Sequence, residues 1–161
     1  MNNNPDLETE LQEFKKILEA SGVAGALQFL SRKTPHRYTG IYKYDGDTLR
    51  NIVLYDSYDQ QVQKGEDAPM SATYCSLVRQ EQRLEIKDAE TDTRVKGKII
   101  TPVVSYCGAL MKDAEGNPFG TVCHFDMKRC EEPISHFPLL EEATTLLFHH
   151  INDKPGTTGN M

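Results

Sequence analysis

The stretch Ser105–Met127, SYCGALMKDAEGNPFGTVCHFDM, predicts two neighbouring strands joined by a tight polar turn. In the second arm, from Phe119 to Met127, apolar and aromatic residues recur at every second position, which is typical of a strand. The connection contains four common turn residues, Asp113, Gly116, Asn117 and Pro118. We expect this hairpin to lie in the middle of an antiparallel sheet, with the last helix of the chain covering it.

The length and composition of the chain are those of one globular domain. Its 161 residues suffice to bury about two-thirds of the surface of the unfolded chain. The net charge of −6 argues against a nucleic-acid partner, which requires a basic surface. No apolar run is long enough to span a bilayer, and Met1–Glu10 is polar and acidic rather than a secretory signal. We therefore expect a cytoplasmic protein that makes no membrane contact.

Apolar residues recur at helical spacing near both ends of the chain. N-terminal helices are expected over about 6–32, with a break at Ser21-Gly22. A C-terminal helix is expected over about 136–152, and Ser135 is its candidate N-cap. Residues 153–161 contain Pro and Gly and are predicted to form a flexible tail.

Between these helices, strand patterns alternate with turns and one short helix, so the sheet core is expected over about 37–127. The predicted elements are the strands Tyr38–Tyr44 and Leu49–Tyr55 joined at Asp45-Gly46, a long loop over 56–68, a helix over Ser71–Gln80 capped by Ser71 or Thr73, and a strand over Arg83–Asp88. Helices at both ends with antiparallel strands between them predict an α+β fold.

Four blocks of the sequence resemble the GAF domain family. They are Ser71–Val78, Leu84–Asp88 with the following Asp92–Arg94, the YCGAL strand Tyr106–Leu110, and Asp113–Asp126 with its GTVCHFD ending. The resemblance implies a single domain over 1–152, related to the PAS fold. It also implies a central antiparallel sheet of five or six strands, with the terminal helices packed on one face and a ligand pocket on the other.

The candidate ligand-binding residues lie in these blocks and on the strands around the implied pocket. They are Tyr42, Tyr55, Thr73, Tyr74, Cys75, Asp88, Arg94, Tyr106 and Gly108. Tyrosine offers an apolar wall with a polar tip, and glycine on a strand permits close approach of a ligand or backbone. Asp88, Asp92 and Arg94 are open to two interpretations, a polar subsite or an ion pair that orders a loop.

The four cysteines show no CxxC pair or metal-ligand spacing, so reduced thiols are expected. Cys75 lies near the start of a helix, where the helix dipole lowers the pKa of a thiol. Cys107 and Cys123 are predicted to be buried strand residues. Cys123 and His124 are adjacent on one strand and must face opposite sides of the sheet, so no metal site is predicted there.

The function expected first is a stand-alone, non-enzymatic sensory module that binds a small molecule and acts through a homodimer or a partner signalling protein. The ligand or cofactor is left unidentified, and the cyclic-nucleotide motif of the family is absent after Asp126. One alternative is a thiol-dependent free methionine sulfoxide reductase with Cys75 as its catalytic residue. Against it, the chain has no cysteine between Asp88 and Tyr106. The other alternative is a ligand-free dimerisation scaffold.

Overall fold

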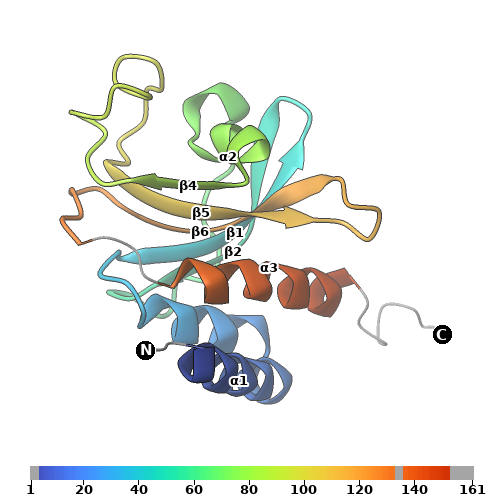
Figure 1. Ribbon diagram of the computed structural model, residues 1–161. Helices are drawn as coiled ribbons and strands as arrows, with labels where there is room; N and C mark the ends of the chain where they lie inside the picture. The colour runs from blue at the N-terminus through green and yellow to red at the C-terminus, as the bar shows by residue number, and fades with distance from the viewer. Residues whose placement is uncertain (1–3, 133–135, 153–161) are drawn as a thin grey trace.

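The computed structural model describes residues 4–132 and 136–152. Its centre is a six-stranded sheet in the order β3-β2-β1-β6-β5-β4, and every neighbouring pair is antiparallel (Figure 1). The strands are β1 (Tyr38–Asp45), β2 (Thr48–Asp56), β3 (Ala68–Pro69), β4 (Arg83–Ile86), β5 (Ser105–Lys112) and β6 (Pro118–Asp126). The predicted α+β fold is therefore confirmed, and the sheet has six strands where five or six were predicted.

The predicted central hairpin is β5 and β6. β6 pairs with β5 on one side and with β1 on the other. In the turn, the Asp113 carboxylate accepts the backbone N–H groups of Glu115 (3.0 Å) and Asn117 (2.9 Å), and Gly116 has a φ of 88°. Aspartate and glycine therefore close the hairpin for the reasons that made them turn signals, namely local acceptance of hydrogen bonds and a positive φ.

The hairpin between β1 and β2 also forms, one residue later than its predicted turn. Asp45 pairs with Thr48, so the two-residue loop is Gly46-Asp47, and Gly46 has a φ of 59°. A positive φ at the first loop position is the requirement of a tight hairpin turn, and glycine meets it without strain.

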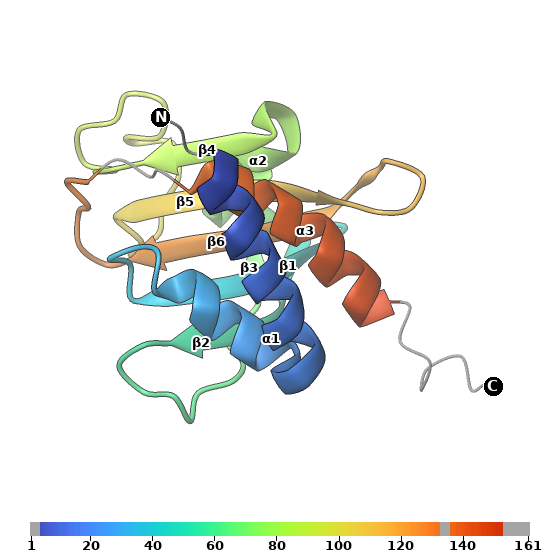
Figure 2. The same ribbon diagram turned by 60° about the horizontal axis from the view of Figure 1, so that its bottom comes forward.

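One face of the sheet is covered by α1 (Asn4–Ser31) and α3 (Phe137–Asn152), which lie side by side (Figures 1 and 2). α1 bends at Gly22, whose φ of 73° and ψ of −166° are open almost only to glycine. The predicted break at Ser21-Gly22 is thus confirmed. The proposed cap Ser135 and the predicted tail 153–161 lie outside the described residues.

The core beneath these helices is continuous with the sheet. Its fully or almost fully buried apolar side chains include Phe14, Leu27, Leu30, Ile41, Met111, Val122, Leu139, Leu140 and Leu147. In the described part of the chain, no helix combines the length and apolarity needed to cross a membrane.

The opposite face carries α2 (Cys75–Glu81), seen in Figure 1 on the side of the sheet away from α1 and α3. The predicted helix over Ser71–Gln80 begins too early. Met70–Ala72 form a separate 3₁₀ turn, which the extended backbone of Thr73 ends. Ser71 therefore does not cap α2. The N-cap is Tyr74, without a side-chain bond, and the Thr73 hydroxyl accepts the N–H of Ser76 (3.3 Å).

Candidate functional site

A cavity of about 110 Å³ lies on the α2 side of the sheet. The strands supply Tyr42, Tyr106, Cys123 and Phe125 to its lining, and the start of α2 supplies Tyr74 and Cys75. Segments before α2 and before β5 complete the wall, with Glu66 on one side and Val103 on the other. Aromatic walls with a few converging polar groups are the usual composition of a small-molecule site.

The polar groups of this cavity converge on the thiol of Cys75. Its Sγ is hydrogen-bonded with the hydroxyl oxygens of Tyr106 (3.1 Å) and Thr121 (3.2 Å). All of these side chains are buried, and Cys123, on the same strand face as Thr121, lines the same cavity as Cys75. A helix start, two hydroxyls and a second thiol thus meet at one point of the cavity floor.

The strand register explains how Tyr106 reaches Cys75. Gly108 follows Tyr106 on the same face of β5 and pairs with Cys123 of β6. A Cβ atom at Gly108 would lie 2.4 Å from the hydroxyl oxygen of Tyr106, which is closer than packed atoms approach. The missing side chain of Gly108 therefore lets the Tyr106 ring lie along β5, with its hydroxyl at Cys75.

Further hydrogen bonds hold the wall of the cavity in place. The Tyr74 hydroxyl donates to the Val103 carbonyl (2.7 Å), and the Tyr44 hydroxyl donates to the Cys75 carbonyl (2.6 Å). The rings of Tyr74 and Tyr106 pack edge to face with centroids 5.4 Å apart. These contacts tie α2 and the segment before β5 to the sheet, so the protein's own hydrogen bonds hold the wall of the cavity.

Burial raises the pKa of Tyr42, of Tyr106 and of the Cys123 thiol. Cys75 behaves differently. Its burial also opposes ionisation, but hydrogen bonds from Cys123, Thr121 and Tyr106 stabilise the thiolate and outweigh burial, so its pKa is lowered. Cys75 is therefore the thiol of this pair that ionises first. Among the described residues that line the cavity, Glu66 is the only aspartate, glutamate, lysine, arginine or histidine.

Five of the nine predicted site residues line this cavity, namely Tyr42, Thr73, Tyr74, Cys75 and Tyr106. Gly108 supports the site from below without lining it. Tyr55 lies on the other face of the sheet, packed against the core beneath the terminal helices. The cause is a bulge in β2, where Ile52 is the extra residue between the pairs Ile41–Val53 and Tyr42–Asn51. A bulge reverses the alternation of faces, so Leu49 lines the cavity while Tyr55 does not.

Asp88 and Arg94 also lie away from the cavity, at a separate depression of about 250 Å³. The Arg94 guanidinium donates to the Asp92 carboxylate (2.6 Å) and to the Glu85 carbonyl (2.8 Å). The Asp88 carboxylate accepts the N–H of Glu90 (3.0 Å). Of the two interpretations of this motif, the contacts within the loop favour the ion pair that orders it.

The predicted site omitted Glu66, Cys123 and Phe125, which also line the cavity. The alternation of β6 places Cys123 and Phe125 on one face of the strand, but the pattern alone does not tell which face lines the cavity. Glu66 lies in the loop between β2 and β3, and no periodic pattern marks it. Cys123 faces the cavity and His124 faces the helices, as predicted for neighbours on a strand.

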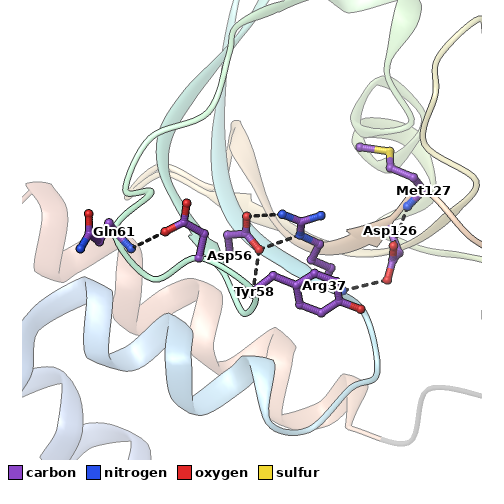
Figure 3. Close-up of polar contacts among 7 residues, drawn as sticks. Arg37, Asp56, Tyr58, Gln61, Asp126 and Met127 are labelled. Carbon is purple, nitrogen blue, oxygen red and sulfur yellow. Dashed lines mark hydrogen bonds and ion pairs between the residues drawn. The ribbon is translucent and has the colours of Figure 1, made fainter.

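The loop that carries Glu66 is anchored at its start by an ion pair (Figure 3). The Arg37 guanidinium donates to both oxygens of the Asp56 carboxylate (2.8 and 2.9 Å), and Asp56 also accepts the N–H of Tyr58 (2.9 Å). The Asp126 carboxylate accepts the backbone N–H of Arg37 (3.0 Å), which joins this anchor to the end of β6. Near its other end, the loop is held by the N–H of Gly65, which donates to Asn51 Oδ1 (2.7 Å).

A second polar cluster is buried on the helix side, where His124 of β6 meets His36 and His136. His124 Nε2 lies 3.0 Å from His136 Nε2, and His124 Nδ1 is hydrogen-bonded with the Thr39 hydroxyl (2.7 Å). Within residues 4–132 and 136–152, no three His, Cys, Asp or Glu side chains are arranged to hold a metal ion.

No family model matches the chain, and no curated protein matches its sequence. Solved structures do match. The GAF domain of an Acinetobacter phosphoenolpyruvate-protein phosphotransferase is 12% identical with a TM-score of 0.73, over 99% of this chain and 100% of that one. The free methionine-R-sulfoxide reductase of Neisseria meningitidis, solved with its substrate, is 10% identical with a TM-score of 0.70, over 98% and 95%.

A third match is the type II free methionine-R-sulfoxide reductase of Thermoplasma acidophilum. It is 17% identical with a TM-score of 0.61, over 89% of this chain and 96% of that one. At such identities the likeness concerns the fold alone. The matches span nearly the whole length of both partners and agree with the six-stranded sheet and its helix layer. This protein has the GAF fold.

Proposed function

We propose that this protein is a non-enzymatic sensory module that binds a small molecule in the cavity beneath α2. The observation that carries the proposal is the cavity itself, about 110 Å³ in volume, with aromatic walls and a buried polar centre at Cys75. A water molecule needs only about 10–15 Å³ of such space, so the cavity has room for several water-sized groups. That size fits a small ligand or one end of a larger one.

The sheet offers a physical route from this cavity to the terminal helices. β1, β5 and β6 each present residues to both faces, and their opposite-face residues Ile41, Cys107 and Val122 are buried beneath α1 and α3. A ligand that shifts these strands also shifts the packing of the helices, because protein interiors are close-packed. We propose that the helices pass this change to a second copy of the chain or to a partner signalling protein.

Native mass spectrometry of freshly purified protein, with a denatured control, tests both parts. We expect a dimer that carries a non-covalent adduct, and we expect the adduct to be lost on denaturation. Ala72→Leu places a larger side chain in the cavity lining and should abolish the adduct. Ala24→Leu, on the exposed side of α1, is the control and should retain it.

Two results would count against the proposal. An adduct that persists in Ala72→Leu would mean that the ligand binds elsewhere. Bare protein, together with no thermal stabilisation by any member of a metabolite library, would favour the scaffold alternative. A monomer at all concentrations would refute the dimer. Ligand binding would still be decided by the adduct in the same mass spectra.

The second candidate is thiol-dependent reduction of free methionine sulfoxide. It is supported by the position of Cys75, which lies in the cavity beside Cys123, and two solved relatives of similar fold are named as such reductases. The test is NADPH consumption with thioredoxin, thioredoxin reductase and free methionine-R-sulfoxide. Turnover that disappears in Cys75→Ser would establish the enzyme, and absence of turnover in the wild type would exclude it.

A further inference from the structure

We propose that Cys75 and Cys123 form a dithiol site that a hydroperoxide entering the cavity converts to a reversible disulfide. This goes beyond ligand binding, since it assigns a covalent modification to two residues and names the chemical class that drives it. It also does not depend on the identity of any ligand.

The first support is position. Cys75 begins α2 and Cys123 lies in the middle of β6, and both line the same cavity. The Cys75 Sγ is 3.2 Å from the Thr121 hydroxyl oxygen, and Thr121 precedes Cys123 by one alternation on the same face of β6. The Tyr106 hydroxyl, 3.1 Å from the same sulfur, lies over Gly108, the strand partner of Cys123. The sulfur of Cys75 is therefore held directly over the face from which the Cys123 thiol projects.

The second support is the division of roles between the two thiols. The thiolate is the form that attacks peroxides, and Cys75 has three donors around its sulfur: the Tyr106 and Thr121 hydroxyls and the Cys123 thiol. Cys123 is buried on β6, and burial together with the neighbouring Cys75 raises the pKa of its thiol, so it is the harder of the two to ionise. One group is therefore suited to react first and the other to resolve the product.

The other two cysteines have neither feature. Cys107 lies on the opposite face of the sheet in the core beneath the helices, and burial raises the pKa of its thiol. Cys130 follows β6, and its Sγ points to the Glu132 carbonyl at 3.5 Å. All four thiols are free in the structure, so the pair is in the reduced state from which the reaction starts.

The reaction proceeds in two balanced steps. The Cys75 thiolate attacks the terminal oxygen of the hydroperoxide, an S–O bond forms, the O–O bond breaks, and the alkoxide leaves and takes a proton to become an alcohol, or water from hydrogen peroxide. The Cys123 sulfur then attacks the sulfenic acid of Cys75, the S–S bond forms, and hydroxide leaves with the Cys123 proton as water. The two thiols lose two electrons together, and one peroxide is reduced.

The product would join the first turn of α2 to β6 across the floor of the cavity. It removes the thiol that the Tyr106 and Thr121 hydroxyls now contact, and it shortens the distance between the two sulfurs to a covalent bond. The oxidised cavity therefore has a different floor, and a small ligand would bind it with altered affinity.

The test uses the full-length protein and hydrogen peroxide as the probe. After treatment, remaining thiols are blocked with N-ethylmaleimide, and peptide mapping without reductant identifies the linked peptides. We expect a Cys75–Cys123 disulfide, loss of two alkylation sites, and recovery of both after dithiothreitol. Cys123→Ser should stop at a sulfenic acid on Cys75 that dimedone traps, and Cys75→Ser should form no disulfide. Cys107→Ser and Cys130→Ser are controls that should behave as wild type.

Mapping of the wild-type protein alone decides the question, even if a variant does not fold. A folded protein whose Cys75 and Cys123 both remain alkylatable after peroxide treatment would overturn the proposal, and so would a disulfide between any other pair. Because no ligand is added, failure here would leave the sensory function untouched, and failure of ligand binding would leave the dithiol untouched.

Discussion

The absence of a side chain at Gly108 allows the ring of Tyr106 to lie against β5 at this position. The Tyr106 ring occupies the space of a Cβ atom at this residue. Its hydroxyl is hydrogen-bonded with Cys75, and its ring packs edge to face with that of Tyr74. The ring therefore cannot move away without losing these contacts. Gly108 on β5 therefore affects the surroundings of the Cys75 thiol through the position of Tyr106.

We expect Gly108→Ala to lower the free energy of unfolding by about 1–3 kcal/mol, the usual cost of overpacking. The displaced Tyr106 hydroxyl would no longer stabilise the Cys75 thiolate, so Cys75 should also be slower to alkylate. Urea denaturation and the rate of N-ethylmaleimide labelling measure the two effects. In a Tyr106→Leu background the clash is gone, so the same change should cost less. An equal cost in both backgrounds would show that Tyr106 is not the reason for the glycine.

The alternation of side chains between the two faces of a strand could be predicted from the sequence. The change of faces caused by the bulge in β2 could not. The opposite orientation of Cys123 and His124 follows from the period of any strand. The position of Tyr55 does not, because the bulge at Ile52 arises from the pairing of β2 with β1. Nothing in the sequence Leu49–Tyr55 marks the extra residue. The face of Tyr55 was therefore decided by a contact with another strand.

At the scale of elements, the loop between β2 and β3 is the segment that joins the cavity to the edge of the sheet. Its start is held by Arg37 and Asp56, and its later part supplies Glu66 to the cavity. The Arg37 guanidinium also lies over the rings of Tyr38 (4.9 Å) and Tyr58 (4.4 Å). This stacking orients the guanidinium for its two-pronged contact with Asp56.

We expect Asp56→Asn to speed amide hydrogen exchange across 57–67, because the substitution keeps the size of the side chain and removes the charge that Arg37 binds. Mass-spectrometric exchange, read by peptide, measures the effect. Asp92→Asn breaks a comparable ion pair with Arg94 in the other long loop and serves as the control. It should speed exchange near Arg94 only. Unchanged exchange over 57–67 in Asp56→Asn would mean that the loop is held by its backbone contacts.

At the scale of the whole molecule, the stability of the fold is coupled to pH through the buried histidines. Burial lowers the pKa of His36 and of His136 to about 4, and it also lowers the pKa of His124 well below its ordinary value. Of the charged groups nearby, Asp126 opposes the shift at His36, Glu10 opposes it at His136, and Lys33 adds to it at His136. The folded protein therefore keeps all three rings neutral at pH values where the unfolded chain binds protons.

We expect the free energy of unfolding to fall as the pH drops from about 6.5 towards 4, by up to about 1.4 kcal/mol per pH unit for each histidine. The sign follows because the unfolded state binds more protons in this range. The carboxylates of Asp56 and Asp92, whose pKa values are lowered by Arg37 and Arg94, withdraw their stabilisation only at lower pH. Urea denaturation at a series of pH values measures the slope.

His136→Gln should flatten this dependence, and His149→Gln, an exposed position on α3, should not. A wild-type slope that is already flat between these pH values would mean that the cluster accepts protons without loss of stability. A slope that persists unchanged in His136→Gln would assign the effect to other groups.

The sequence by itself determined the order of the helices and of every strand except the two-residue β3, the two hairpins to within one residue, the bend in α1 and the antiparallel α+β fold. These features rest on local physics, since strand alternation, turn residues and helical spacing act between residues close in the chain. The tertiary structure alone decided which residues meet at the cavity. Cys75, Tyr106 and Cys123 come from distant segments, and their meeting depends on strand register, on the space above Gly108 and on the docking of α2. Such contacts depend on three-dimensional packing, which no local pattern in the chain encodes.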